Sequence, residues 1–594
     1  MLSYKAPVRD MRFIFDEVLD GSRLQALPGF EEVDPDTVET ILEEAGKFCE
    51  NELLPLNRDG DEEGCRWEDG QVATPKGFKE AYRSLCESGW NSIAMDADYG
   101  GQGLPKTLNL MIDEMISSTN LSFSLYPGLT NGAYDALAAY ASDELKQSYF
   151  PRMADGTWSA SMCLTEPHSG TDLGLLRTKA VPQDDGSYCI SGTKIFITAG
   201  EHDLTDNILH LVLARTPDAP KGIKGISLFL VPKILVNDDG SLGGANGVSC
   251  GSIEHKMGIK ASATCVMNFD DAKGFLIGDL NKGMRAMFKM MNTERVAVGM
   301  QGLGISEAAY QGAVEYARER IQGRALTGAK QPDKAADSLI VHPDVRRMLL
   351  TIRANTEGCR ALGIWLGMQL DISAHESDAQ KRQEAEDLVA LLTPVAKAYL
   401  TDVGFDSAVL GQQVFGGHGY IREHGMEQLV RDARIAQIYE GTNGVQAMDL
   451  VGRKLPAEGG RYLERYFALI NAFISENQGD DALNEFVQPL EMAFEHLQEA
   501  TGWLSRSAAE NVDEIGAAAY DYMRLTGQIT LALLWARMAK TALVKQAESG
   551  DVFYRTKLKT AHFYMQRLLP QTQSLLTSIQ SGATSLMVFD EEEF

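Results

Sequence analysis

The chain has 594 residues, of which 44% are hydrophobic and 23% charged, and its formal net charge is −28 at pH 7. This length exceeds what one hydrophobic core organises, and the composition is that of an ordinary globular protein. The negative charge argues against nucleic-acid binding, which needs a basic surface, whereas a polyanionic small ligand needs only a local cluster of Lys and Arg. No run of about 18 apolar residues is present, so we predict no membrane span.

The eight cysteines are scattered along the chain, without any C-x-x-C pair, and none follows Cys359. Such spacing predicts neither a disulfide framework nor a zinc site, and we predict no other metal site. The first ten residues also lack the basic segment and apolar stretch of a secretory signal. We therefore expect a cytoplasmic protein with structural thiols.

Residues 1–158 are predicted to form an N-terminal helical domain. Within them, residues 36–39 read Asp-Thr-Val-Glu and resemble a capping box. Apolar residues follow with the spacing of one helix face, namely Val38, Ile41, Leu42, Ala45 and Phe48.

Residues 159–280 are predicted to form a separate β domain. Short β-prone runs alternate there with turn residues, a pattern that favours an antiparallel sheet or barrel. The runs cover residues 158–165, 185–192, 194–198, 208–214, 226–231 and 264–269.

Helical patterns return after residue 280. Residues 283–323, 343–370 and 381–414 carry long apolar stripes and few prolines, as helices of an antiparallel bundle do. We predict a helical bundle domain at 281–458 and an extra C-terminal helical domain at 459–594. The predicted fold class is thus an α+β multidomain protein.

One candidate site residue is a carboxylate in residues 437–444, which read Gln-Ile-Tyr-Glu-Gly-Thr-Asn-Gly. Glu440 lies there between apolar residues and a Gly-Thr turn. An apolar environment raises the pKa of a Glu from ~4.3 toward neutrality, so that it can take a carbon-bound proton. A surface Glu that caps a helix is the alternative that the local composition leaves open.

The order of four motifs resembles that of the acyl-CoA dehydrogenase family. Residues 163–172, Cys-Leu-Thr-Glu-Pro-His-Ser-Gly-Thr-Asp, resemble its first signature, except that Leu175 replaces a small residue. Residues 431–442, which begin Arg-Asp-Ala-Arg, resemble the second signature, and residues 316–320 and 413–417 are further matches. The total length resembles the longer branch of the family. The implied fold has an N-terminal helical domain, a central β-barrel domain, a C-terminal helical bundle and an additional helical domain.

The resemblance implies FAD-dependent α,β-dehydrogenation of an acyl-CoA thioester to the 2-enoyl-CoA. Glu440 is the implied catalytic base, which removes the α-proton while the β-hydrogen passes as hydride to flavin N5. Hydrogen bonds must then stabilise the enolate-like thioester oxygen, and the family draws one from the N–H of the base itself. Glu294 lies where some members place their base; because this chain has both, we interpret Glu294 as a neighbouring or structural acid.

The resemblance also implies the cofactor contacts. Phe196 stands where the family usually has Trp beside the flavin ring, and it keeps an aromatic face but lacks the N–H donor. Arg320, Gln413, Gly416 and Gly417 are implied to reach FAD across a subunit interface, so a homodimer is expected. The full implied set for FAD is Thr165, Thr171, Phe196, Thr198, Arg320, Gln413, Gly416, Gly417 and Thr442. The chain departs from the family at Gln322-Gly323, on the adenine side, and at Gly444, beside Thr442.

Arg295, Tyr439 and Gly441 are the implied substrate contacts, and an ion pair on a helix face is the alternative for Arg295. Within the longer branch the motifs do not separate 3-methylmercaptopropionyl-CoA, a substrate of DMSP degradation, from straight-chain acyl-CoA of fatty acid β-oxidation. The implied electron acceptor is an electron-transfer flavoprotein. An acyl-CoA oxidase, which uses oxygen, and a non-catalytic flavin-binding relative are the alternative hypotheses.

Overall fold

The computed structural model describes residues 3–594 and divides into two compact units. One, here called the inserted unit, is the continuous segment Glu44–Ala297; the other, the helical unit, combines Met1–Glu43 with Val298–Phe594. The chain crosses between them inside two helices, α3 (Pro35–Phe48) and α9 (Gly283–Glu319). The domain boundaries at residues 158, 280 and 458 stay predictions.

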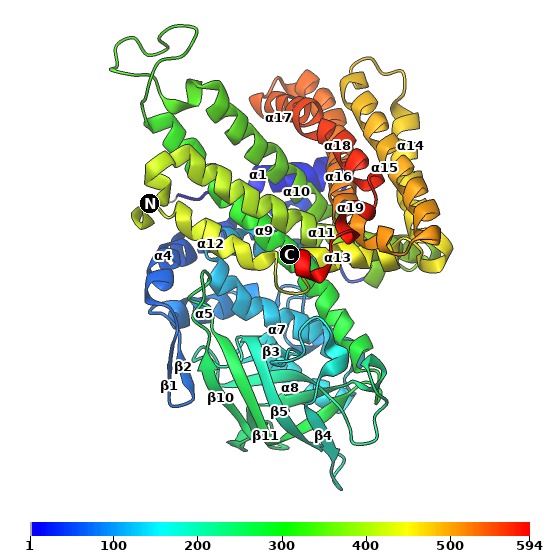
Figure 1. The fold of residues 1–594 in the computed structure, drawn as a ribbon. Coiled ribbons are helices and arrows are strands. Elements are labelled where there is room, and N and C mark those ends of the chain that lie inside the picture. Colours follow the sequence, from blue (N-terminus) through cyan, green and yellow to red (C-terminus); the bar gives the residue numbers. More distant parts are fainter. Residues whose placement is uncertain (1–2) are drawn as a thin grey trace. The chain divides into compact units, whose positions relative to one another are not determined.

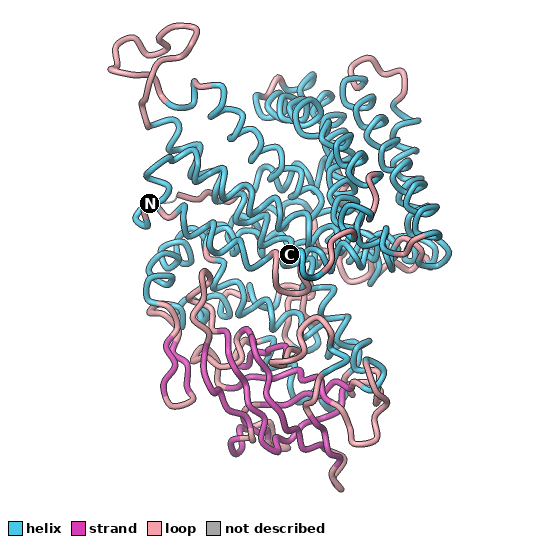
Figure 2. Tube along the Cα trace, viewed as in Figure 1, coloured by secondary structure: helices cyan, strands magenta, loops and turns pink. Residues whose placement is uncertain are grey.

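The inserted unit contains a large sheet together with helices (Figures 1 and 2). Its helices are α4 (Leu54–Glu63), α5 (Phe78–Glu87), α6 (Lys106–Thr119), α7 (Leu121–Tyr140) and α8 (Asp143–Ala154). A short hairpin lies among them, where only helices were predicted, and consists of β1 (Arg66–Glu68) and β2 (Gln71–Ala73). The remaining strands are β3 (Trp158–Cys163), β4 (Lys179–Pro182), β5 (Tyr188–Thr198), β6 (Asn207–Ala214), β7 (Ser227–Pro232), β8 (Ile234–Val236), β9 (Leu242–Ala245), β10 (Val248–Ile253) and β11 (Thr264–Ile277).

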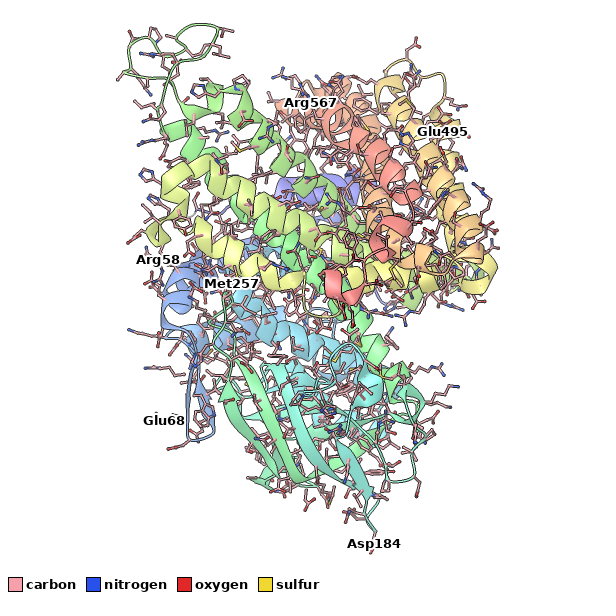
Figure 3. All side chains as sticks on the ribbon, in the orientation of Figure 1. Arg58, Glu68, Asp184, Met257, Glu495 and Arg567 are labelled. Carbon is pink, nitrogen blue, oxygen red and sulfur yellow. The ribbon has the colours of Figure 1, made fainter. Side chains whose placement is uncertain are left out.

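The seven-stranded sheet has the order β3-β6-β7-β11-β5-β4, and β10 pairs with β11. The purely antiparallel sheet predicted from the sequence is wrong in one pair, because β3 and β6 run parallel. Parallel neighbours need a long crossover connection, and the segment between these strands provides it while forming β4 and β5 on the way. The turn between β4 and β5 carries Asp184 at its tip (Figure 3).

The buried strand β6 divides the core of the inserted unit into two parts. All eight of its residues are buried. Successive side chains of a strand point to opposite faces, and accordingly Leu209, Leu211 and Leu213 belong to one hydrophobic cluster while Val212 and Ala214 belong to another. The first cluster also contains side chains of α7 and α8, which lie beside the sheet in Figure 1.

The helical unit is built almost entirely of helices. The long helices predicted from the sequence are confirmed as α9, α10 (Pro343–His375) and α11 (Ala379–Phe415). The others are α1 (Val8–Arg12), α2 (Ser22–Gln25), α12 (Met426–Ala436), α13 (Asn443–Asp449), α14 (Arg461–Asn477), α15 (Asn484–Glu510), α16 (Asp513–Ser549), α17 (Val552–Phe563), α18 (Thr572–Gln580) and α19 (Thr584–Met587).

One helical stretch, Ala379–Tyr420, is long and apolar enough to cross a membrane by length and composition alone, although the sequence pattern predicted no such helix. In the structure 83% of its most apolar window is buried. Because α11 packs against α10, α12, α13 and α16, this apolarity is that of a central bundle helix, which passes the same test.

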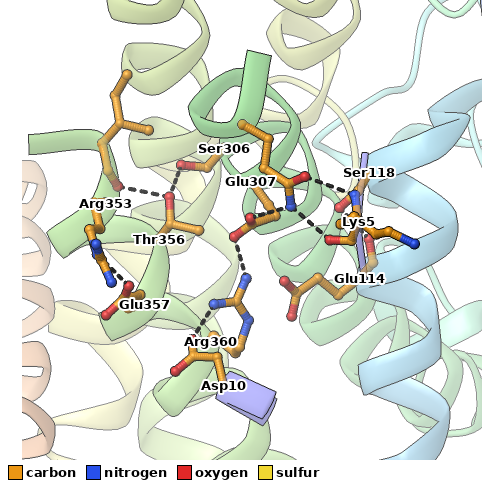
Figure 4. A network of polar contacts seen from close by, with 12 residues as sticks. Lys5, Asp10, Glu114, Ser118, Ser306, Glu307, Arg353, Thr356, Glu357 and Arg360 are labelled. Atoms are coloured by element: carbon orange, nitrogen blue, oxygen red, sulfur yellow. Dashed lines mark hydrogen bonds and ion pairs between the residues drawn. The ribbon is translucent and has the colours of Figure 1, made fainter. Parts of the chain in front are cut away.

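A buried ionic cluster joins α1 and α17 to the bundle, and Figure 4 shows the part of it that contains Asp10, Arg360 and Glu307. Asp10 Oδ2 accepts from Arg360 Nη1 at 2.5 Å, and Lys557 Nζ bonds both Asp10 and, at 2.7 Å, Glu357 Oε2. Arg360 also donates to Glu307 Oε2 at 2.5 Å. Burial raises the pKa of Asp10, but the charges of Lys557 and Arg360 outweigh it, so the pKa lies below its usual value.

The helix start predicted at residues 36–39 is shifted by two residues. Asp34, not Asp36, caps α3, because its side chain accepts from the Thr37 N–H at 2.8 Å and its carbonyl accepts from the Val38 N–H. Pro35 fits the first helical position, where an N–H would have no helical partner. Asp36 therefore lies inside the first turn.

Candidate active site

The segment that connects α12 to α13, residues 437–444, carries the predicted base and is here called the base loop. Glu440 lies within it with its side chain half-buried. Its φ is +56°, and that of Gly441 is +84°. A non-glycine residue in the left-handed region is uncommon and persists only when its surroundings hold it there.

Two side chains hold the backbone of the base loop at this turn. Gln446 Nε2 donates to the carbonyl of Glu440 at 3.0 Å. Lys397, a fully buried residue of α11, donates from Nζ to the carbonyl of Gly441 and to Asn443 Oδ1, both at 2.9 Å. The ammonium group thus fastens the residue that follows the predicted base to the central helix of the bundle.

The carboxylate of Asp402 holds both ends of the base loop. Its Oδ1 accepts from Gln437 Nε2 and from Asn443 Nδ2, each at 2.7 Å. Asn443 also donates to the carbonyl of Ala398, so its side chain is held by α11 at several points. The loop is consequently built on α11, through Lys397 and Asp402.

The other predicted residues of the base loop make contacts within the protein. Their predicted contacts with substrate and FAD stay predictions. The Tyr439 hydroxyl donates to Gln301 Oε1, and the Gly441 carbonyl is taken by Lys397. Thr442 is the N-cap of α13, where its Oγ1 accepts from the Val445 N–H at 3.3 Å.

Glu294 and Arg295 are adjacent buried residues of α9, within the inserted unit. The Glu294 carboxylate lies against the backbone of α7, since a Cβ added at Gly132 would collide with Glu294 Oε1. Arg295 donates to Asn292 Oδ1 at 3.4 Å, and its guanidinium lies 6.0 Å from the Phe288 ring centroid. The interpretation of Glu294 as a neighbouring or structural acid and the CoA contact of Arg295 both stay predictions.

The first signature forms a second loop, residues 164–172, which follows β3 and is here called the cofactor loop. It is organised by Glu166, whose carboxylate accepts from the Arg177 and Thr178 N–H groups at 2.7 and 3.0 Å and from Thr178 Oγ1 at 2.6 Å. Fully buried Lys194 of β5 completes the set, donating at 2.9 Å to Glu166 Oε1 and to the Leu164 carbonyl. Burial raises the pKa of Glu166, but Lys194 and these hydrogen bonds outweigh it and lower that pKa overall.

Phe196 occupies a β-bulge beside the cofactor loop. The pairing of β5 with β11 shifts register between Lys194 and Ile197, and Phe196, within this bulge, has φ +59° and a 60% exposed side chain. A bulge can re-aim a side chain, and this one presents an aromatic ring to solvent. The Ile195 N–H donates to the Thr165 carbonyl at 2.9 Å, which places the cofactor loop next to this ring.

Arg320, Gln413, Gly416 and Gly417 are all exposed residues of the helical unit. Gly416 has φ +59°, and a Cβ built at Gly416 or at Gly417 meets nothing within 4 Å. Backbone can therefore be approached closely at both glycines, as the predicted cofactor contact requires.

The predicted residues thus form groups within each unit. In the inserted unit, Thr165, Phe196 and Thr198 gather around the end of β5, with Thr171 on the cofactor loop. In the helical unit the base loop carries Glu440 and its neighbours. Sequence reasoning missed the residues that hold these loops, Lys194, Lys397 and Asp402. The one available signal was a lone charge in an apolar stretch, as in Val395-Ala396-Lys397-Ala398.

The donor set fits FAD. Within residues 3–594 the hydroxyls of Thr165, Thr171 and Thr198 have no hydrogen-bond partner, and neither do the guanidinium of Arg320 and the amide of Gln413. Hydroxyls beside an exposed aromatic ring suit a flavin, and a free guanidinium suits a pyrophosphate.

Comparison with known proteins gives four family matches in chain order. The acyl-CoA dehydrogenase N-terminal, middle and C-terminal domains match residues 35–157, 161–272 and 281–455. A fourth model, described as acetyl-CoA dehydrogenase C-terminal like, matches residues 466–590.

Several known proteins are similar to this one along the whole chain. A 3-methylmercaptopropionyl-CoA dehydrogenase of Ruegeria pomeroyi is 43% identical over 588 residues, 99% of each chain. A butyryl-CoA dehydrogenase of Syntrophomonas wolfei is 34% identical over 610 residues, 100% of this chain and 99% of the other. The solved acyl-CoA dehydrogenase of Bacillus anthracis, complexed with FAD, has a TM-score of 0.75 at 20% identity, covering 97% of this chain and 92% of that one, and shows the likeness of fold.

Proposed function

Since the chain belongs to the acyl-CoA dehydrogenase family, we propose that Glu440 is the base with which it removes the α-proton of its substrate. The protein is an FAD-dependent acyl-CoA dehydrogenase, and its reaction converts a saturated acyl-CoA thioester to the 2-enoyl-CoA. The assignment of individual residues to the steps of this reaction is our proposal.

The observation that carries the proposal is the fixed backbone at Glu440. Its carbonyl and that of Gly441 are bonded to Gln446 and Lys397, and its φ is left-handed. A base must lie within about 3 Å of the carbon-bound proton that it takes, so a carboxylate on a fixed, half-buried turn suits the role. The same turn fixes the N–H of Glu440 as a donor for the thioester oxygen.

In the proposed mechanism Glu440 accepts the α-proton while its own N–H stabilises the negative charge that develops on the thioester oxygen. When bound, FAD supplies the acceptor for the β-hydrogen and its electron pair. Thr165, Thr198 and Phe196 would hold the flavin ring, and Thr171 the pyrophosphate. Arg320, Gln413, Gly416 and Gly417 would reach the FAD of a partner copy, so that Arg320 supplies positive charge to its phosphates.

We propose 3-methylmercaptopropionyl-CoA and short straight-chain acyl-CoA esters as the candidate substrates, on the similarity to the two relatives named above. Pentanoyl-CoA is the matched comparison, because it differs from 3-methylmercaptopropionyl-CoA only by a methylene in place of the thioether sulfur. A methylene and a thioether sulfur are nearly isosteric, so an apolar pocket that reads shape alone should give the two esters similar kcat/KM values. A kcat/KM at least ~10-fold higher for the thioether would show that the pocket recognises the sulfur and would assign the enzyme to DMSP degradation.

The proposed assembly is a cytoplasmic homodimer that passes its electrons to an electron-transfer flavoprotein. The exposed Arg320 and Gln413 support a shared site, since a second copy gives them a cofactor to contact. Light scattering should give a dimer with two FAD; a monomer would contradict shared sites. A peroxide assay under air should stay negative, whereas peroxide release in step with turnover would favour the oxidase.

Exchange of each carboxylate for its amide tests the base. Glu440→Gln should keep FAD and bind acyl-CoA but slow flavin reduction by more than the ~10²–10⁴-fold typical of a lost general base. Glu294→Gln is the matched control and should cost far less, because that carboxylate packs against α7. Anaerobic rapid mixing isolates this step from the electron acceptor. Fast flavin reduction in Glu440→Gln together with slow reduction in Glu294→Gln would show that Glu294 of α9 is the base.

A further inference from the structure

The family match to residues 281–455 ends before α16, which lies in the additional C-terminal segment matched at residues 466–590. Tyr520 of α16 nevertheless reaches back into the bundle. Its hydroxyl donates to Asp402 Oδ2 at 2.6 Å. Asp402 belongs to α11 and is only 7% exposed, whereas Tyr520 is 40% exposed, so the contact covers a buried carboxylate of the helical unit from its surface.

The same carboxylate receives the two ends of the base loop. Gln437 and Asn443 flank Glu440 on either side, and both donate to Asp402 Oδ1 at 2.7 Å. One buried side chain therefore collects three donors, two from the base loop and one from the additional segment. Arg434 of α12 extends the network, since its Nη1 donates to Gln437 Oε1 at 3.0 Å.

Three donors on one carboxylate fix its orientation more firmly than two, because each short charge-assisted bond restricts the same group. The Tyr520 hydroxyl is a permanent donor. Burial, followed by its hydrogen bond to Asp402, raises the pKa of Tyr520 above its usual value, so the phenol stays protonated at neutral pH. If this donor is lost, Oδ2 loses its phenol partner while Oδ1 still carries both loop contacts.

We propose that Tyr520 is a positioning residue, through which the additional C-terminal segment holds the base loop by way of Asp402. The inference rests on the proposed role of Glu440 as base. It assigns to this segment a part in proton abstraction, in addition to any part in assembly. Tyr520 itself lies outside the set of groups proposed to touch substrate or FAD.

The test compares two Tyr→Phe variants on the same helix. Tyr520→Phe removes the hydroxyl bonded to Asp402; Tyr522→Phe removes one that bonds Thr501 Oγ1 of α15 at 2.7 Å, within the additional segment. Hydrogen exchange of residues 437–446 and anaerobic flavin reduction are measured on each holoenzyme. Tyr520→Phe should raise the exchange and lower the reduction rate constant by roughly 10- to 100-fold, the factor for one hydrogen bond to a charged group.

Further readouts separate positioning from general damage. In Tyr520→Phe the FAD content and the acyl-CoA dissociation constant should be unchanged, and the deuterium isotope effect of the α-position should rise as proton abstraction becomes slower. Tyr522→Phe should leave loop exchange and reduction at the wild-type values. In an Asp402→Asn background, Tyr520→Phe should add little, since both act through one group.

Unchanged loop exchange in Tyr520→Phe, or equal changes in both Tyr variants, would overturn the proposal. So would faster loop exchange with an unaltered reduction rate. Failure of the base assignment is recognised separately, because Glu440→Gln would then reduce its flavin quickly, while the exchange comparison would still decide whether Tyr520 holds the loop.

Discussion

The cofactor loop and the base loop are each fastened by a fully buried lysine, but the two lysines have different partners. Lys194 is paired with the carboxylate of Glu166 and also bonds a carbonyl. Lys397 bonds the Gly441 carbonyl and the amide oxygen of Asn443. The two lysines should respond differently to mutation, because removal of Lys194 leaves the buried carboxylate of Glu166 behind, whereas removal of Lys397 takes a donor from a carbonyl and an amide oxygen.

The two loops differ in how strongly distant residues can influence them. The cofactor loop is held from within the inserted unit, since Glu166 bonds backbone groups 11 and 12 residues further along the chain and Lys194 of β5. The base loop depends on α11, and through Asp402 it depends on α16 as well. Sensitivity to distant residues is thus expected at the base loop.

The largest expected effect is that of Lys194→Met. Breaking a buried ion pair by removing one partner costs about 3–5 kcal/mol, and the loop around Glu166 should lose its geometry, so the protein should be purified with little FAD. Urea unfolding and the flavin absorbance measure both effects. The double variant Lys194→Met/Glu166→Leu should recover much of the lost free energy of unfolding. No recovery would show that the unpaired Glu166 carboxylate is not the cause of the loss.

Lys397→Met should have a smaller effect on stability and a clearer one on chemistry. The Gly441 carbonyl and Asn443 Oδ1 lose their closest donor but keep longer bonds to Gln446 Nε2 and Thr401 Oγ1, so the cost is about 1–3 kcal/mol in all. The cofactor loop is untouched and FAD should remain bound. A displaced base costs on the order of 10² in rate, so anaerobic flavin reduction should slow accordingly. Loss of FAD to the same extent as in Lys194→Met would remove the distinction between the two loops.

Acid should weaken the inserted unit through two buried histidines next to β3, the strand that leads into the cofactor loop. His202 bonds Ser159 Oγ and His210 bonds Ser161 Oγ, and burial lowers the pKa of each to about 3. Between the unfolded pKa of ~6.5 and this value the unfolded state binds more protons, so stability falls as pH falls, by about 1.4 kcal/mol per pH unit for each histidine. Thermal unfolding from pH 7 to 4.5 should show this slope, and His210→Asn should flatten it; an equal slope in the variant would exclude His210 as a cause.

Thr442→Ala should have the smallest effect. The variant loses the N-cap of α13, which costs about 1 kcal/mol, and Thr442→Ser should restore it. FAD retention distinguishes the cap from the predicted cofactor contact. If Thr442→Ala weakens FAD binding while Thr442→Ser does not, the hydroxyl both caps α13 and contributes to FAD binding.

The sequence predicted those parts of the fold that depend on local pattern. The long helices α9, α10 and α11 carry apolar stripes with helical spacing, and the strand at 208–214 is an apolar run interrupted only by His210. The parallel pairing of β3 with β6 has no local signature, since partners are chosen across more than 40 residues. Most of the run at 185–192 and the run at 194–198 form one strand, β5, because Gly192, Thr193 and Lys194 pair with β11 without interruption.

The candidate site shows the same limit. The motifs located Glu440 and the threonines, which lie in recognisable stretches, but not the side chains that hold them. Lys397 bonds Gly441 across 44 residues, and Tyr520 bonds Asp402 across 118. Nothing near Lys397 or Tyr520 in the chain indicates the partner, so only the packed helices bring these groups together.

The buried ionic cluster has a consequence for the order in which the protein is made. Asp10 and Lys557 lie 547 residues apart. At a synthesis rate of roughly 5–20 residues per second, Asp10 waits on the order of half a minute to two minutes for this partner. The continuous segment Glu44–Ala297 can fold on the ribosome in the meantime. Residues 3–43 cannot complete their contacts before α17 has been synthesised, so the helical unit closes later than the inserted unit can, and a nascent-chain chaperone would find the apolar side chains of this segment exposed until then.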